Sequence, residues 1–256
     1  MKVILATAKA PHNRRSDFAM RTWVGADEVR EIECARTAAD IGCRRECFYI
    51  KDLYDESLKL APDDIFVFMN NDCALVSGWA DVLIPAVYQF GVAYSHRAIV
   101  QKFTKPLSLK DIANLKTDLG MDLIAFRPAW WMKYRNEFPD AVHSHEGYDF
   151  AAIWYARKEG FDRMPAIIYH EAHPSFWNRS ENLQNDPVQK HVRKLLTEWA
   201  HKVGAQKYLG SNYLFKSIYT QYSDQAPYAP MLSNRERKEI QSAAIRLASA
   251  RWKRKW

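Results

Sequence analysis

A cluster of polar residues follows the most apolar segment of the chain. Residues 64–69 read Asp-Ile-Phe-Val-Phe-Met, and Asn70-Asn71-Asp72 come directly after them. A carboxylate at this point could bind a hard divalent cation through oxygen, and the cation could in turn bridge a diphosphate. Asparagine and aspartate are also common turn residues, so a simple strand-to-loop turn is the alternative.

Two histidines follow a second apolar segment, Ala-Ile-Ile-Tyr at residues 166–169. They are His170 and His173, with Glu171 between them. Imidazole nitrogen suits Mn²⁺ or Zn²⁺, so either side chain could contribute to a metal site. Their spacing of three differs from the H-E-x-x-H spacing of zinc proteases. The alternative is that one of the pair is a packed, hydrogen-bonded histidine.

Two carboxylates lie at the expected N-terminus of a helix over residues 147–158. They are Glu146 and Asp149, and they follow His143 and His145. A general base must lie within hydrogen-bond reach of the hydroxyl that it deprotonates, and a carboxylate here could serve. Helix capping and the helix dipole would account for one of the two.

In this order along the chain, the clusters resemble the glycosyltransferases of the GT-A fold. Between the first cluster and the carboxylates comes the segment Met121-Asp122-Leu-Ile-Ala-Phe-Arg127, which resembles the acceptor-side strand of that superfamily. The resemblance covers about residues 1–180. It implies a nucleotide-sugar donor, a divalent metal (Mn²⁺ or Mg²⁺) and transfer of the sugar to an acceptor hydroxyl.

The resemblance also implies roles for individual residues. Asp149 or Glu146 would be the catalytic base. The metal ligands would be Asp72 with His170 or His173. The residues expected to bind the donor are Thr7, Ala8, Arg14, Arg15, Asn70, Asn71 and Asp72. The residues expected to contact the acceptor are Asp122, Trp130 and Trp131. The chain departs from the family's D-x-D motif at its first position, which is Asn70.

The elements that position these clusters alternate between apolar strands and amphipathic helices. The expected strands cover residues 2–8, 45–50, 64–69, 91–94, 121–126 and 166–169. The expected helices cover residues 27–41, 52–60, 77–88, 147–158 and 186–203. This alternation predicts an α/β fold with a mixed, mostly parallel sheet flanked by helices, Rossmann-related and GT-A-like. Ligands of such sheets bind beyond the carboxyl ends of the strands, which is where the polar clusters lie.

The charge of the chain is concentrated near its C-terminus. The net charge of +7 comes from 37 basic and 30 acidic residues, and residues 235–256 alone hold eight basic and two acidic ones. We expect a GT-A-like catalytic domain over 1–207. A Tyr-rich connection and a basic amphipathic helix, over 208–256, would form a C-terminal appendage.

The tail suggests what the acceptor is. It mixes cations with an aromatic ring, as nucleic-acid-binding surfaces do, and its expected contacts are Arg251, Trp252, Lys253, Arg254 and Lys255. This favours a DNA-modifying, phage-type transferase that acts on a hydroxylated base, reached by base flipping. Three alternatives stay open: a glycan or lipid-linked acceptor at a membrane surface, a non-catalytic nucleotide- or nucleic-acid-binding module, and a solvated helix without a partner. No partner protein is predicted.

Several classes of protein are disfavoured by what the sequence lacks. With nine glycines, the chain contains neither G-x-G-x-x-G nor the P-loop motif, which argues against dinucleotide enzymes and P-loop NTPases. It has no apolar run of about 18 residues and no secretory signal. The four cysteines show no zinc spacing, so we expect free thiols and a cytoplasmic location, in the host cytoplasm for a viral protein.

Overall fold

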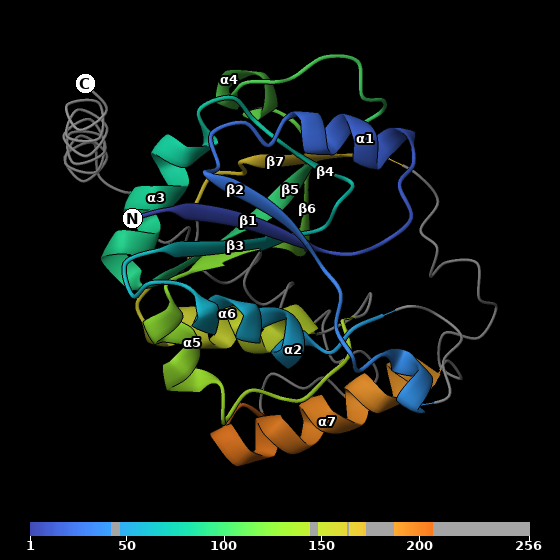
Figure 1. Ribbon diagram of the computed structural model, residues 1–256, viewed down its shortest axis with the longest axis vertical. Coiled ribbons are helices and arrows are strands. Elements are labelled where there is room, and N and C mark those ends of the chain that lie inside the picture. The colour runs from blue at the N-terminus through green and yellow to red at the C-terminus, as the bar shows by residue number, and fades with distance from the viewer. Residues whose placement is uncertain (42–46, 144–147, 163, 173–186, 207–256) are drawn as a thin grey trace.

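A seven-stranded mixed sheet with helices packed around it organises the described part of the chain (Figure 1). The computed structural model describes residues 1–41, 47–143, 148–162, 164–172 and 187–206. The strands are β1 (Val3–Ala8), β2 (Glu28–Ile32), β3 (Ile65–Met69), β4 (Cys73–Leu75), β5 (Val92–Val100), β6 (Thr117–Phe126) and β7 (Ile168–Glu171). The α-helices are α1 (Arg14–Arg21), α2 (Ile50–Asp55), α3 (Trp79–Phe90), α4 (Leu109–Ile112), α5 (Pro128–Tyr134), α6 (Tyr148–Lys158) and α7 (Pro187–Val203). Two short 3₁₀ helices are η1 (Ala38–Ile41) and η2 (Glu56–Lys59).

The strands of the sheet follow the order β2-β1-β3-β6-β5-β7-β4. β1 is parallel to β2 and β3, and β5 is parallel to β7. β6 runs antiparallel to both β3 and β5, and β4 runs antiparallel to β7. Five strands therefore share one direction, and the expectation of a mixed α/β sheet flanked by helices is confirmed. The reversal of β6 brings its first residues to the edge where β3 and β5 end.

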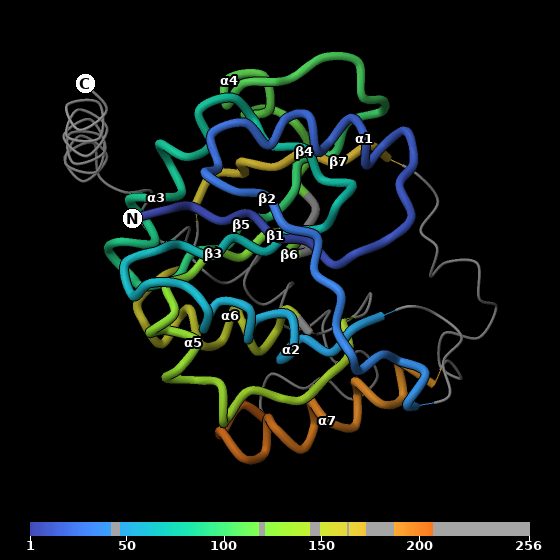
Figure 2. Tube along the Cα trace, in the orientation of Figure 1, coloured from blue at the N-terminus to red at the C-terminus, as the bar shows by residue number. Residues whose placement is uncertain are grey.

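The most apolar segments of the sequence form the centre of this sheet. All five residues of β3 are buried, as are the first five residues of β1. Strands buried on both faces need cover on both sides of the sheet. α1 lies against β4 on one side, and α2, α5 and α6 lie on the other (Figures 1 and 2). α7 packs on α6 and η1, on the side of these elements away from the sheet.

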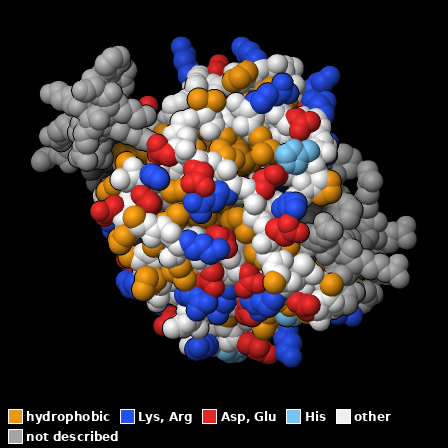
Figure 3. All heavy atoms as spheres, in the orientation of Figure 1, with side chains coloured by type: hydrophobic (Ala, Val, Ile, Leu, Met, Phe, Trp, Pro, Cys, Tyr) orange, Lys and Arg blue, Asp and Glu red, His pale blue; other side chains and the backbone are white. Residues whose placement is uncertain are grey.

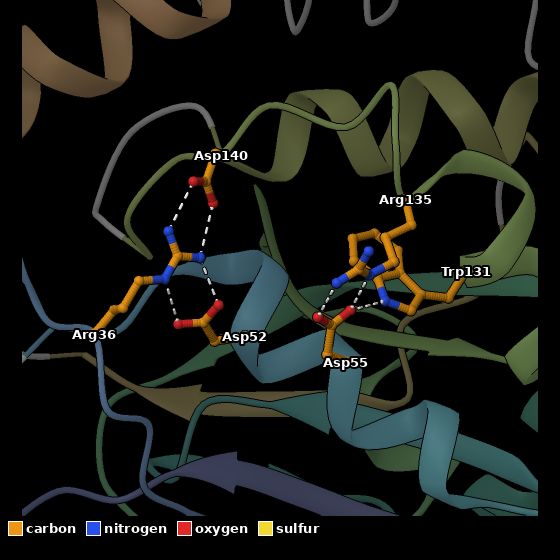
Figure 4. A network of polar contacts seen from close by, with 6 residues as sticks. All are labelled: Arg36, Asp52, Asp55, Trp131, Arg135 and Asp140. Carbon is orange, nitrogen blue, oxygen red and sulfur yellow. Dashed lines mark hydrogen bonds and ion pairs between the residues drawn. The ribbon is translucent and has the colours of Figure 1, made fainter.

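Two charged clusters tie α2 to its surroundings (Figure 4). The carboxylate of Asp55 accepts hydrogen bonds from the indole of Trp131 (2.8 Å) and from two guanidinium nitrogens of Arg135 (2.6 Å each). Arg36 donates to both Asp52 and Asp140, at distances of 2.5–3.1 Å. Together the clusters link α2 to α5, to the segment after β2 and to the loop before α6.

The structure corrects two of the predicted elements. Residues 27–41, expected as a helix, form the edge strand β2 and the short helix η1. The parallel ladder between β1 and β2 pairs Ile4 with Glu28 and Ala8 with Ile32, and this tertiary pairing overrides the local helical pattern. Residues 45–50 were expected as a strand; the part of this segment that the structure describes, 47–50, forms isolated bridges at Phe48 and Tyr49 and then enters α2 at Ile50.

Other expectations agree with the structure in kind and differ in extent. Strands occur where β1, β3, β5, β6 and β7 were expected, but β5 continues to Val100 and β6 begins at Thr117. α3, α6 and α7 also occur as expected, and α3 is followed by the C-cap residue Gly91, whose φ of 78° suits glycine. Residues 207–256, which hold the expected appendage, lie outside the described residues. No helix within the described ranges has both the length and the apolar character needed to cross a bilayer.

Candidate functional site

Polar side chains from four strands meet at one edge of the sheet. β3 ends at Met69 and β7 ends at Glu171, both pointing toward this edge, and the reversed β6 begins there. The turn from Asn70 to Cys73 links β3 to β4 and is closed by a hydrogen bond from the Cys73 N–H to the Asn70 carbonyl (3.1 Å). This turn carries the first of the three polar clusters on which the sequence-based prediction depends, and it lies between β6 and β7.

The first half of the turn is held against β6. The side-chain amide of Asn70 donates to Oδ1 of Asp122 at 2.6 Å, and its backbone N–H donates to the Asp122 carbonyl at 3.1 Å. Oδ2 of Asp122 lies 2.9 Å from a guanidinium nitrogen of Arg97 on β5. Asp122 retains only 8% of its side-chain exposure, so its charge is balanced by Arg97 and the Asn70 amide rather than by water.

Arg97 reaches Asp122 across an irregular part of the sheet. The register between β5 and β6 shifts on both sides of His96, so that Ser95 pairs with Leu123 while Arg97 pairs with Asp118. A bulge of this kind changes the direction in which the neighbouring side chains point. Arg97 was not among the predicted site residues, because β5 was expected to end at residue 94. The signal that could have found it is the pair His-Arg inside the apolar run 92–100.

The second half of the turn faces β7. Oδ2 of Asp72 lies 3.1 Å from Nε2 of His170, and Cys73 pairs with His170 in the β4–β7 ladder. The Asp72 side chain is 26% exposed and that of His170 is 9% exposed, so a ligand from solvent can approach the pair on the Asp72 side. Burial, together with the nearby carboxylates of Asp122 and Asp72, raises the pKa of the Cys73 thiol well above its usual value. The Cys73 side chain at this site is therefore a neutral thiol and not a thiolate.

The donor set of Asp72 and His170 fits a divalent metal. A carboxylate oxygen and an imidazole nitrogen are both acceptable to Mn²⁺. Their separation of 3.1 Å is that of two adjacent ligands on an octahedral ion with bonds of about 2.1 Å. Among the described residues, no group of three or more histidine, cysteine or carboxylate side chains could hold a metal ion. His173, the alternative metal histidine, lies outside the described residues.

Asp149 joins the site from the first turn of α6. It is buried, 7% exposed, and its Oδ2 accepts a hydrogen bond from the backbone N–H of Met121 at 3.4 Å. Of the third predicted cluster, Asp149 therefore contacts the residue that precedes Asp122 in β6. Glu146, the alternative base, is outside the described residues.

α1 closes the site on the side of β7. The side chain of Asn13 caps this helix by accepting from the backbone N–H groups of Arg15 and Ser16, so Arg14 and Arg15 lie in its first turn rather than in the expected loop. Arg14 forms an ion pair with Glu171.

Glu171, the residue between the two predicted histidines, anchors this end of the site. Its second carboxylate oxygen accepts from the backbone N–H of Phe103 at 2.7 Å. Burial alone would raise the pKa of Glu171, but the bonds from Phe103 and Arg14 outweigh burial and hold the pKa below its usual value. Glu171 is therefore a structural anion of the site.

Two side-chain N–H groups that were expected to bind the nucleotide sugar have no hydrogen-bond partner among the described residues. They are the buried Nε of Arg15 and the buried Nδ2 of Asn71. Buried polar atoms are normally paired, so each marks a position where a ligand or water would be bound. Thr7 is almost fully buried at the end of β1, and Ala8 beside it is half-buried.

Two predicted acceptor contacts lie in the core. Trp131 is fully buried and donates to Asp55, and Trp130 is 4% exposed and packs on Phe126 with a centroid distance of 5.0 Å. Helix α5 directs both rings inward, which argues against an acceptor-binding role for either. The five predicted nucleic-acid contacts between 251 and 255 lie outside the described residues.

The chain was compared with protein-family models and with curated proteins, and neither comparison found a match. The function is therefore argued from the arrangement of the site itself.

Proposed function

We propose that the chain is a GT-A-type glycosyltransferase that moves a sugar from a nucleotide-sugar donor to an acceptor hydroxyl, the acceptor being a hydroxylated base in DNA. The observation that carries the proposal is the Asn70–Cys73 turn, which places Asp72 3.1 Å from His170 and Asn70 2.6 Å from Asp122 at one sheet edge. A mixed α/β sheet with its ligand-binding groups at the carboxyl ends of strands is compatible with this class.

On this proposal, the diphosphate of the donor lies between the Asp72–His170 pair and α1. Asp72 and His170 would hold Mn²⁺ or Mg²⁺, which when bound offsets the charge of the leaving diphosphate. The unpaired Nε of Arg15 and Nδ2 of Asn71 would donate to phosphate oxygens. Asn70 and Arg97 are positioning residues that hold the turn against β6 through Asp122.

Asp149 is the group proposed to act on the acceptor. In an inverting transfer, the acceptor oxygen forms a bond to the anomeric carbon while the bond from that carbon to the diphosphate oxygen breaks. The carboxylate of Asp149 takes the hydroxyl proton. Its hydrogen bond from the Met121 N–H holds the carboxylate against β6, the strand that also carries Asp122.

The experiment uses the full chain with a panel of nucleotide sugars, with and without Mn²⁺. Released nucleoside diphosphate reports donor hydrolysis, and mass spectrometry of hydroxymethylated DNA, a glycan and a lipid-linked acceptor reports transfer. Asp72→Ala should lower both rates by at least about 100-fold, because the proposed metal loses its carboxylate. Asp63→Ala is the matched control, since Asp63 is an exposed carboxylate just before β3, at the opposite end of that strand.

Each result decides between named alternatives. Near wild-type rates for Asp72→Ala would overturn the proposal. Nucleotide binding without any turnover would identify a non-catalytic nucleotide-binding module instead. Sugar transfer only to the glycan or lipid-linked acceptor would retain the transferase and exclude DNA as its acceptor.

A further inference from the structure

A row of lysines lies in the segment between β5 and β6. This lysine rim consists of Lys102, Lys105, Lys110 and Lys116, and all four side chains are exposed. The segment 101–116 contains one acidic residue, Asp111, whose carboxylate caps the short helix α4 by accepting from the Ser108 N–H at 2.7 Å. The rim therefore presents a net positive charge to solvent.

The segment that carries the rim is fixed beside the candidate site. The N–H of Phe103 donates to Glu171, the residue that follows His170, and the Phe103 ring stacks on Phe18 of α1 at 4.7 Å. Farther along, the Leu107 N–H donates to the Tyr169 hydroxyl at 3.3 Å. Because these contacts anchor the segment to β7 and α1, the rim lies next to the proposed donor site.

None of the four rim lysines has an ion-pair partner among the described residues. Nine other lysine and arginine side chains do form ion pairs: Lys9, Arg14, Arg30, Arg36, Lys59, Arg97, Lys133, Arg135 and Arg157. Figure 3 shows basic side chains standing out from the surface over α4 and α1. Unpaired surface cations raise the local potential and attract polyanions.

We propose that the lysine rim binds the phosphate backbone of DNA and so guides the acceptor to the site, an inference that rests on the proposed function. Phosphate contacts of this kind position DNA without reading its sequence. Binding to an anionic membrane would call for exposed apolar side chains that insert beside the cations. The exposed large apolar side chains of the described residues are Met1, Val24, Val29, Leu58 and Met132, and none lies on α1 or in 101–116.

The test measures binding of a fluorescent DNA duplex to the full chain at several salt concentrations. The variant is Lys102→Gln/Lys105→Gln/Lys110→Gln. The matched control is Lys190→Gln/Lys194→Gln/Lys202→Gln, which removes the same charge from exposed lysines of α7. The rim variant should bind at least about tenfold more weakly at ~0.1 M salt, with a salt slope smaller by about 0.9 per lost phosphate contact. The control should stay within about twofold of wild type, because screening limits the reach of distant charges.

If the two triple variants lose DNA affinity equally, the loss depends only on net charge and not on the lysine rim, and the proposal is overturned. Binding to anionic vesicles in preference to DNA would overturn it in favour of a membrane surface. Donor hydrolysis by the wild-type protein without DNA is measured in parallel. If no donor hydrolysis is found, that result counts against the proposed function. The role of the lysine rim is decided separately, by the DNA-binding measurement.

Discussion

The side-chain amide of Asn70 donates a 2.6 Å hydrogen bond to the buried carboxylate of Asp122, 52 residues later in the chain. Under the proposed function, residue 70 stands where a D-x-D motif has a carboxylate, and this contact accounts for an amide at that position. The carboxylate of Asp122 pairs with Arg97 through one oxygen, and its other oxygen accepts a hydrogen bond, so residue 70 must supply an N–H or O–H group. A carboxylate at 70 could not supply one while ionised.

The first prediction concerns this pair. Asn70→Asp should lower the free energy of unfolding at pH 7 by about 2 kcal/mol, because it replaces a hydrogen bond by two adjacent carboxylates. The double variant Asn70→Asp/Asp122→Asn restores one amide and one carboxylate, so it should recover at least about half of the loss. Chemical denaturation measures all three proteins.

The control for this series is Asn114→Asp, the same change at an exposed position before β6. It should alter the free energy of unfolding by less than about 0.5 kcal/mol. A double variant as unstable as Asn70→Asp would show that the Asn70–Asp122 bond is not what the first substitution disrupts.

The second prediction concerns the cluster that Asp55 forms with Trp131 and Arg135. Asp55→Ala should lower the free energy of unfolding by about 2–3 kcal/mol, because it leaves the buried indole N–H of Trp131 without an acceptor. Arg135→Ala removes only the partly exposed cation and should cost about 1 kcal/mol. Lys59→Ala breaks the exposed pair with Glu56 and should cost less than about 0.5 kcal/mol. A different ranking of the three in urea denaturation would contradict this assignment of roles.

The third prediction is a pH dependence of stability. Burial lowers the pKa of His143 from 6.5 to about 4, and its ring packs edge-on against Phe68 at 5.6 Å. Between pH 6.5 and 4 the unfolded chain binds a proton here that the folded chain does not. Above pH 6.5 the titration of His143 does not change the free energy of unfolding. Between pH 6.5 and 4 it lowers that free energy by about 1.4 kcal/mol per pH unit, about 3 kcal/mol in all.

Urea unfolding at pH 7, 6, 5 and 4.5 tests this sign. The free energy of unfolding of His143→Gln should decrease less steeply with acidification than that of wild type. His12→Gln should differ from wild type only near and above pH 6.5 and in the opposite sense, because the hydrogen bond to Glu31 raises the pKa of His12, so that its stabilisation is complete below pH 6.5 and is lost as the pH rises. Identical pH profiles for wild type and His143→Gln would refute the assignment.

The apolar runs were sufficient to predict the centre of the sheet. The uninterrupted apolar run after Asp64, residues 65–69, is typical of a strand buried on both faces, and it forms β3. The amphipathic stripe and the cap at residues 186–204 similarly predict α7. β2 was missed because an edge strand with exposed, charged residues carries a weak local signal, and its partner β1 decides its conformation.

Residue types and their order along the chain determined which side chains could do chemistry here. Asp72, Asp149 and His170 were expected to share a site, and the structure brings Asp72 to His170 and Asp149 to the start of β6. Only the tertiary structure decided the rest. The reversal of β6 pairs Asp122 with Asn70, and the bulge in β5 directs Arg97 to the same carboxylate. It also places Trp130 and Trp131 in the core, because local sequence defines a helix but its packing defines which face is buried.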